Sequence, residues 1–120
     1  MLAIALNFSG NAEEALNFYA KVFGYKIKDT DVDKGENGLI IHAELTIYGN
    51  RLMLSDAETD STFSGFLLSV VLGDEVELKQ VFTALSDGAE ILAPLAKVDF
   101  SECYGVLKDK FGVTWQICLI

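Results

Sequence analysis

The 120-residue chain has little positive charge: nine Lys and Arg stand against eighteen Asp and Glu, for a formal net charge of −9. Because sequence-independent binding of nucleic acid requires a basic face, this balance argues against a nucleic-acid partner. The same deficit argues against an anionic membrane surface. No apolar run approaches the roughly 18 residues of a membrane-spanning helix. No basic segment precedes the apolar residues 1–7, so we expect no secretory signal.

Cysteine and proline are also scarce. The cysteines are Cys103 and Cys118, and Pro94 is the one proline. A secreted domain of this size more often carries several cysteines, so we expect a cytoplasmic protein with two unpaired thiols. A disulfide or a redox role is the alternative. Hydrophobic residues make up 51% of the chain, which argues against disorder.

An internal repeat organises the chain, whose length predicts a single domain of residues 1–120. A shift of 63 positions places Gly49 on Gly112 and superimposes the apolar stripes of two helices. These stripes are Ala15, Phe18, Tyr19 and Val22 in the first helix and Leu78, Val81, Phe82 and Leu85 in the second. The shift predicts two units, at about residues 1–58 and 64–120, joined near residues 57–64.

The first unit is predicted to contain one helix among four strands. Residues 2–8 form a short apolar run typical of a buried strand. Asn11 is expected to cap a helix in a capping-box-like pattern with Glu14, and Gly24 to end it. Further strands are expected at residues 25–32, 39–48 and 51–55, with turn residues at 33–38 and a hairpin at Gly49–Asn50.

The second unit repeats this order. A strand is expected at residues 66–72, a helix N-cap at Asp74 and a helix end at Asp87–Gly88. The remaining strands are expected at residues 89–92, 103–108 and 113–119. Two βαβββ units predict an α+β domain in which helices cover one face of curved mixed sheets, and the other faces enclose a cleft.

Four segments carry a resemblance that covers nearly the whole chain. They are Asn11-Ala-Glu-Glu-Ala-Leu-Asn-Phe-Tyr-Ala-Lys-Val-Phe-Gly24, His42-Ala-Glu-Leu45, Leu52-Met-Leu-Ser-Asp-Ala57 and Tyr104-Gly-Val-Leu-Lys-Asp-Lys-Phe-Gly-Val-Thr-Trp-Gln-Ile117. With the duplicated βαβββ pattern, they resemble the vicinal oxygen chelate superfamily of glyoxalases, bleomycin-resistance proteins and dioxygenases. Within it they most resemble the PhnB-like branch. The resemblance implies the fold but no particular reaction.

The resemblance also implies where a metal would be held. Superfamily enzymes place His, Glu or Gln ligands at cleft-facing positions that match Leu6, Met53, Ser69 and Gln116 here. A divalent metal requires anionic or imidazole ligands. Leucine offers none, methionine a weak thioether, and serine and glutamine neutral oxygens. We therefore expect no metal and no other cofactor.

Other residues are candidates for contacting a ligand. His42 alternates with apolar neighbours and is expected to face the cleft or solvent, as a ligand contact, a general base or a structural histidine. Trp115 is expected in the core, with ligand stacking as the alternative. Phe100 could line a pocket or pack on the neighbouring strand. The full set of proposed ligand-binding residues is His42, Arg51, Met53, Ser69, Phe100, Tyr104 and Gln116.

These features favour a metal-free small-molecule-binding protein whose ligand and reaction, if any, are unidentified. The alternative is a divalent-metal-dependent lyase or dioxygenase of glyoxalase type. The resemblance also implies a homodimer. Exposed aliphatic residues at 92–95 and at Ile120 could form an isologous interface between its subunits.

Overall fold

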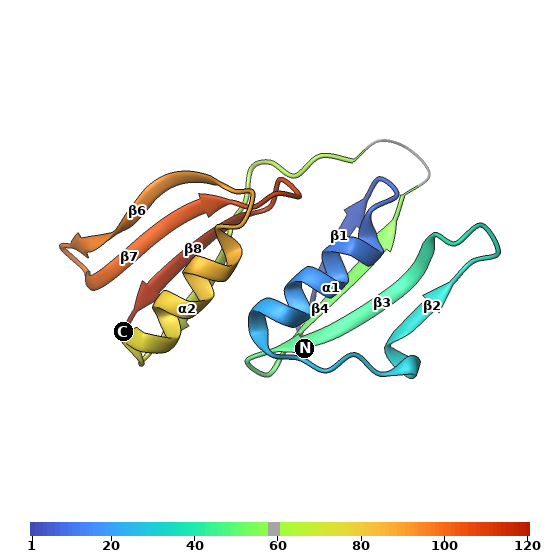
Figure 1. Cartoon of the computed structure of the whole chain (residues 1–120), viewed down its shortest axis with the longest axis horizontal. Helices are drawn as coiled ribbons and strands as arrows, with labels where there is room; N and C mark the ends of the chain where they lie inside the picture. Colours follow the sequence, from blue (N-terminus) through green and yellow to red (C-terminus); the bar gives the residue numbers. More distant parts are fainter. Residues whose placement is uncertain (58–60) are drawn as a thin grey trace. The chain divides into compact units, whose positions relative to one another are not determined.

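The computed structural model describes residues 1–57 and 61–120, which form two compact units, Met1–Thr62 and Phe63–Ile120. Each unit is a four-stranded mixed sheet with one long helix lying across a face (Figure 1). The predicted fold class, α+β with tandem βαβββ units, is therefore confirmed. No helix of the described residues is long and apolar enough to cross a membrane.

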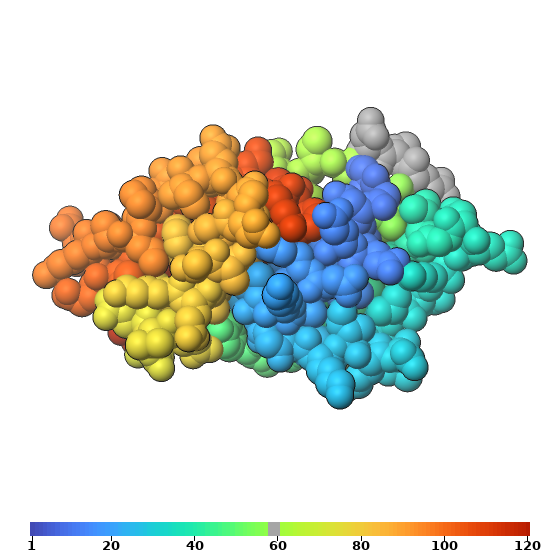
Figure 2. Space-filling model, in the orientation of Figure 1, coloured from blue at the N-terminus to red at the C-terminus, as the bar shows by residue number. Residues whose placement is uncertain are grey.

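The first unit contains a sheet in the order β1-β4-β3-β2. β1 runs parallel to β4, and the other neighbours are antiparallel. The turn between β2 and β3, coloured cyan to teal, projects from the surface of this unit (Figure 2). The elements of the first unit are β1 (Ile4–Phe8), α1 (Ala12–Phe23), the short 3-10 helix η1 (Asp29–Asp31), β2 (Val32–Lys34), β3 (Ile40–Ile47) and β4 (Asn50–Asp56).

The second unit contains the corresponding sheet in the order β5-β8-β7-β6, again with one parallel pair. β6 forms an edge and has several irregularities in its pairing with β7. The elements of the second unit are β5 (Leu68–Leu72), α2 (Glu75–Leu85), β6 (Glu90–Val98), β7 (Ser101–Lys108) and β8 (Thr114–Leu119).

Alternation along the strands separates a covered face from an open face in each unit. In β8, Trp115 and Ile117 are 2% and 0% exposed and lie beneath α2, whereas Gln116 between them is half-buried. In β4, Leu52 and Leu54 are likewise buried, with Met53 between them on the other face. The predicted core position of Trp115 is confirmed. The open faces carry the side chains available to a ligand.

Several expected boundaries are wrong. Residues 25–28 form no strand, and β2 begins only at Val32, because the η1 turn occupies Asp29–Asp31. The hairpin turn is Tyr48–Gly49 rather than Gly49–Asn50, and both turn residues have positive φ, 49° and 79°. Two left-handed residues match the twist of the flanking strands, which explains the glycine. β6 extends to Val98, beyond the expected residues 89–92.

The two helices begin by different means. Asp74 caps α2 directly, since its carboxylate accepts hydrogen bonds from the backbone N–H groups of Val76 and Glu77. Asn11 precedes α1 but makes no side-chain capping bond, so the predicted capping box is wrong. Instead, the Asp56 carboxylate reaches the start of α1 from the end of β4.

Candidate functional site

Three polar side chains form a chain of hydrogen bonds on the open face of the second unit. The Tyr104 hydroxyl donates to Gln116 Oε1 at 3.0 Å, and Gln116 Nε2 donates to Ser69 Oγ at 3.0 Å. The three residues lie on β7, β8 and β5, and Ser69 pairs directly with Gln116 in the parallel ladder. Three residues selected from the sequence are thus brought into contact across three strands.

An aromatic pair borders this chain of hydrogen bonds. The rings of Phe100 and Tyr104 meet edge to face, with centroids 5.0 Å apart and an interplanar angle of 80°. Phe100 follows β6 and remains 70% exposed, so it packs on the neighbouring strand and still presents ring surface. The polar chain and this aromatic pair, made by Ser69, Gln116, Tyr104 and Phe100, are called the β5–β8–β7 site below.

The open face of the first unit has charged side chains instead. Glu44 Oε2 lies 3.5 Å from His42 Nε2 and 3.5 Å from Arg51 Nε. Met53 lies directly across the strand pair from Glu44. His42, Arg51 and Met53 therefore share this face, as expected. Glu44 was not expected among them, although its alternation with His42 placed it on the same side of the strand.

The strand registers correct one predicted correspondence. Ser69 pairs with Gln116, and the equivalent pair in the first unit is Ala5 with Met53. Leu6 pairs with Leu54 instead and is 2% exposed, in the core of the unit. The expectation that Leu6 is a cleft-facing partner of Met53 is wrong, because the first strands are offset by 64 positions rather than 63.

The donors at the positions implied for a metal do not fit a divalent cation. Leu6 is buried, Met53 offers a thioether, and Ser69 and Gln116 are neutral and hydrogen-bonded to each other. In the described parts of the chain, no group of three or more His, Cys, Asp or Glu side chains could hold a metal ion. The donor chemistry therefore favours hydrogen bonding to a neutral molecule over metal coordination.

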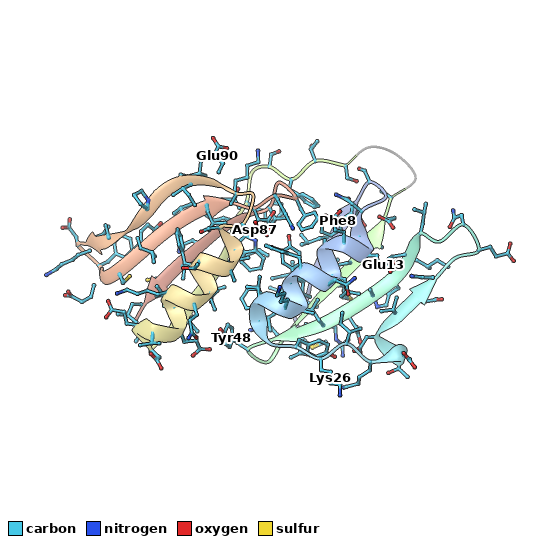
Figure 3. The ribbon with its side chains drawn as sticks, viewed as in Figure 1. Phe8, Glu13, Lys26, Tyr48, Asp87 and Glu90 are labelled. Carbon is cyan, nitrogen blue, oxygen red and sulfur yellow. The ribbon has the colours of Figure 1, made fainter. Side chains whose placement is uncertain are left out.

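A concavity lies elsewhere, in the first unit, between α1 and the segment that leads into β2. It is a half-open groove of about 370 Å³ with an aliphatic lining from Leu16, Ile27 and Val32. Glu13, which emerges from α1 (Figure 3), forms an ion pair of 2.7 Å with Lys34 on β2. The rim carries charged side chains, unlike the β5–β8–β7 site. This groove between α1 and β2 is therefore a competing location for a ligand.

One wall of this groove is held by a tyrosine–aspartate contact. Tyr25 Oη donates to Asp31 Oδ2 at 2.8 Å, and the Lys28 backbone N–H donates to the same oxygen at 2.8 Å. The Lys28 N–H, and secondly the Tyr25 hydroxyl, hold the pKa of Asp31 below its usual value. The bond to Asp31, with a smaller effect of burial, raises the pKa of Tyr25.

We predict that acid loosens this wall. Because the folded-state pKa of Asp31 lies below its unfolded value, the contact stabilises the fold above the unfolded pKa. Its contribution is lost as pH falls through the lowered folded pKa. In Tyr25→Phe, the pKa of Asp31 should rise toward its ordinary value while remaining below it, since the Lys28 N–H still donates. Carboxyl ¹³C NMR titration measures this shift.

Lys28→Ala is the control for that titration. It removes the ammonium group, whose charge lowers the pKa of Asp31 less than either hydrogen bond does, but retains the backbone N–H. Asp31 should therefore keep a clearly lowered pKa in Lys28→Ala. Equal upward shifts in Lys28→Ala and Tyr25→Phe would show that charge, rather than the hydroxyl bond, controls this carboxylate.

Two tandem βαβββ units, each with a sheet open on the side away from its helix, define a glyoxalase-like fold. The model of the 3-demethylubiquinone-9 3-methyltransferase family matches residues 1–118. The chain belongs to this family, the PhnB-like branch of the glyoxalase/bleomycin resistance/dioxygenase superfamily.

Similar proteins support the same assignment. Protein YjdN of Escherichia coli K12 is 30% identical, over 96% of this chain and 92% of its own length. The solved structure of a Bacillus cereus protein, described as a putative 3-demethylubiquinone-9 3-methyltransferase and PhnB protein, is 33% identical with a TM-score of 0.87; the match covers 99% and 98% of the two chains. Protein PA1353 of Pseudomonas aeruginosa is 25% identical with a TM-score of 0.86, over 99% and 98%.

Proposed function

We propose that this protein binds a small organic molecule without a metal, and that the ligand lies against the open face of the second unit. The observation that carries the proposal is the hydrogen-bonded chain Tyr104–Gln116–Ser69 beside the exposed ring of Phe100. Ligand sites combine apolar and aromatic surface with a few oriented polar groups, and this face has both.

The charges of the two open faces support the choice of this unit. On the first unit the Glu44 carboxylate lies 3.5 Å from Arg51 Nε and 3.5 Å from His42 Nε2, so this face carries an ion pair. On the second unit the contacting side chains are all neutral, so desolvating them on binding costs less than desolvating an ion pair.

Methyl transfer, the reaction in the family description, has no support from the fold. Binding of a nucleotide-type methyl donor usually requires a doubly wound parallel sheet with a glycine-rich turn. Each unit here is a mixed sheet with one parallel pair. We expect no heat of binding when S-adenosylmethionine is titrated into the protein, and saturable binding would reinstate methyl transfer.

A thermal-shift screen against metabolites and antibiotics, followed by ¹⁵N NMR, tests the proposal. We expect at least one compound that stabilises the protein and shifts amides of β5, β7 and β8. Gln116→Leu, which removes the central polar group, should abolish that response. The proposal fails if no compound stabilises the protein, or if every ligand shifts only the groove between α1 and β2.

Elemental analysis of protein purified without chelator separates this proposal from a glyoxalase-type metalloenzyme. We expect nickel, zinc and iron well below one atom per chain. If the wild-type protein carries stoichiometric metal and the Gln116→Leu variant does not, the metal-free proposal is overturned. That result would favour a metal-dependent lyase or dioxygenase.

A further inference from the structure

We infer that the β5–β8–β7 site recognises a cis-amide edge, an N–H beside a C=O on a planar ring, as in a lactam. This inference rests on the proposed function and deepens it by naming the chemical class of the ligand. The directions of the two hydrogen bonds carry it.

The direction of each hydrogen bond determines which donors and acceptors remain. Tyr104 spends its single hydroxyl proton on Gln116 Oε1, so the phenolic oxygen can only accept. Gln116 Nε2 uses one of its two hydrogens on Ser69 Oγ and keeps the other. Ser69 Oγ accepts that bond, which leaves its own proton to donate. Within the described chain, these three side chains make no other hydrogen bonds.

Gln116 therefore presents a donor and an acceptor side by side to a ligand. Its remaining Nε2 hydrogen requires a ligand acceptor, and the second lone pair of Oε1 requires a ligand donor. A cis-amide satisfies both at once. A carboxylate offers two acceptors, one of which would face Oε1, and an ammonium group offers only donors, one of which would face the Nε2 hydrogen. Either mismatch leaves a desolvated polar group unpaired.

The surroundings also favour a neutral ligand. The cross-strand neighbours of Tyr104 and Gln116 on this face are Ala96, Val106 and Cys118, and none of them is an Asp, Glu, Lys, Arg or His residue. The charged residues of β7, Glu102 and Lys108, lie near its two ends and are exposed.

The planar part of the ligand has a place to lie. The rings of Phe100 and Tyr104 meet edge to face, with centroids 5.0 Å apart and an interplanar angle of 80°, yet Phe100 is 70% exposed. Aromatic rings stack or meet edge to face at such spacings, so a bicyclic lactam can place its ring against Phe100 while its amide reaches Gln116. The tyrosine serves both parts, as ring neighbour of Phe100 and as the donor that orients the glutamine.

Three matched compounds test the inference on the full chain by ¹⁵N NMR titration. Oxindole carries the complete cis-amide edge, 1-indanone keeps the carbonyl without the N–H, and indane has neither. We expect oxindole to shift amides of β5, β7 and β8 and to bind about fivefold or more tightly than 1-indanone, the order of one net hydrogen bond. Indane should bind more weakly still.

Variants locate the effect. Gln116→Glu keeps the shape but replaces the N–H donors by a second acceptor, and it should remove the preference for oxindole over 1-indanone. Ser55→Ala is the matched control, since Ser55 makes a similar side-chain hydrogen bond, to Asn7 Oδ1 at 2.9 Å, on the open face of the first unit. It should leave that preference unchanged. Unaltered Trp115 fluorescence in each variant shows that the second unit remains folded.

The outcomes separate this inference from the proposed function. If the three compounds bind equally well to the second unit, the face binds planar molecules, but the amide inference is overturned. If oxindole does not bind while other compounds of the thermal-shift screen do, the amide inference again fails and the proposed function stands. If neither oxindole nor any compound of the screen binds, both fail.

Discussion

Asp109→Ala should lower the free energy of unfolding by about 3 kcal/mol, since each buried polar group left unsatisfied costs about 1–3 kcal/mol. Asp109 is only 4% exposed. Its Oδ1 accepts hydrogen bonds from the backbone N–H groups of Phe111 and Val113, and its Oδ2 accepts from Trp115 Nε1 at 2.8 Å. The carboxylate thus fixes the β7–β8 turn and satisfies the indole N–H of a fully buried side chain.

Urea denaturation followed by Trp115 fluorescence measures this loss. The chain has one tryptophan, so the signal reports on the second unit. Asp109→Asn, which keeps the size and one oxygen acceptor, should lose about half as much stability. Asp99→Ala is the matched control: Asp99 is exposed and its side chain makes no hydrogen bond or ion pair within the described chain. Equal losses in Asp99→Ala and Asp109→Ala would refute the role assigned to Asp109.

The sequence predicted the elements that local chemistry determines. Asp74 caps α2 as expected, and Gly24 ends α1 in the left-handed conformation, with φ of 70°. The sequence-based prediction failed where a specific side-chain hydrogen bond determines the path of the chain. Residues 25–32 alternate as a strand would, but the hydrogen bonds of Asp31 to Tyr25 and to the Lys28 N–H turn the chain at η1. Such contacts have no periodic signature in the sequence.

For the site, the sequence predicted on which face of its strand each side chain lies, but not which side chains contact one another. Alternation placed Tyr104 and Gln116 on one side of their strands, and the structure joins them to Ser69. Alternation specifies the face on which a side chain lies, but not the residue opposite it on the neighbouring strand, and the bonds depend on that partner. The error at Leu6 arose because residues 2–6 are apolar throughout and do not alternate. Glu44 was overlooked because its role appears only when β3 and β4 bring His42 and Arg51 to the same oxygen.

The two units place different chemistry at equivalent places in their sheets. The ladders align Ala5, His42 and Met53 of the first unit with Ser69, Tyr104 and Gln116 of the second. A side chain–side chain hydrogen-bonded chain can form only in the second unit, because alanine and methionine have no suitable groups. The two units therefore share the scaffold, while the chain of hydrogen bonds across three strands belongs to the second unit.

The two units also differ in how their helices are stabilised. We predict that Asp56→Ala destabilises the first unit by about 2 kcal/mol, more than the roughly 1 kcal/mol contributed by a simple helix cap. Asp56 Oδ1 accepts from the N–H groups of Gly10 and Ala12 at 2.9 and 3.0 Å, and Oδ2 accepts from Ile40 N at 2.9 Å. One carboxylate at the end of β4 thus joins the start of α1 to the start of β3.

Hydrogen exchange resolved by residue measures the effect of Asp56→Ala, because Trp115 lies in the other unit. Amides of α1 and β3 should exchange faster together, since the contact that couples them is lost. Asp33→Ala is the matched control, because Asp33 is exposed on β2 and its side chain makes no hydrogen bond or ion pair within the described chain. Faster exchange confined to the first turn of α1 would show that Asp56 acts as a local cap only. Faster exchange of both elements together would show that Asp56 couples α1 to β3. The start of α1 would then depend on a contact between distant segments, whereas the start of α2 depends on the local cap Asp74.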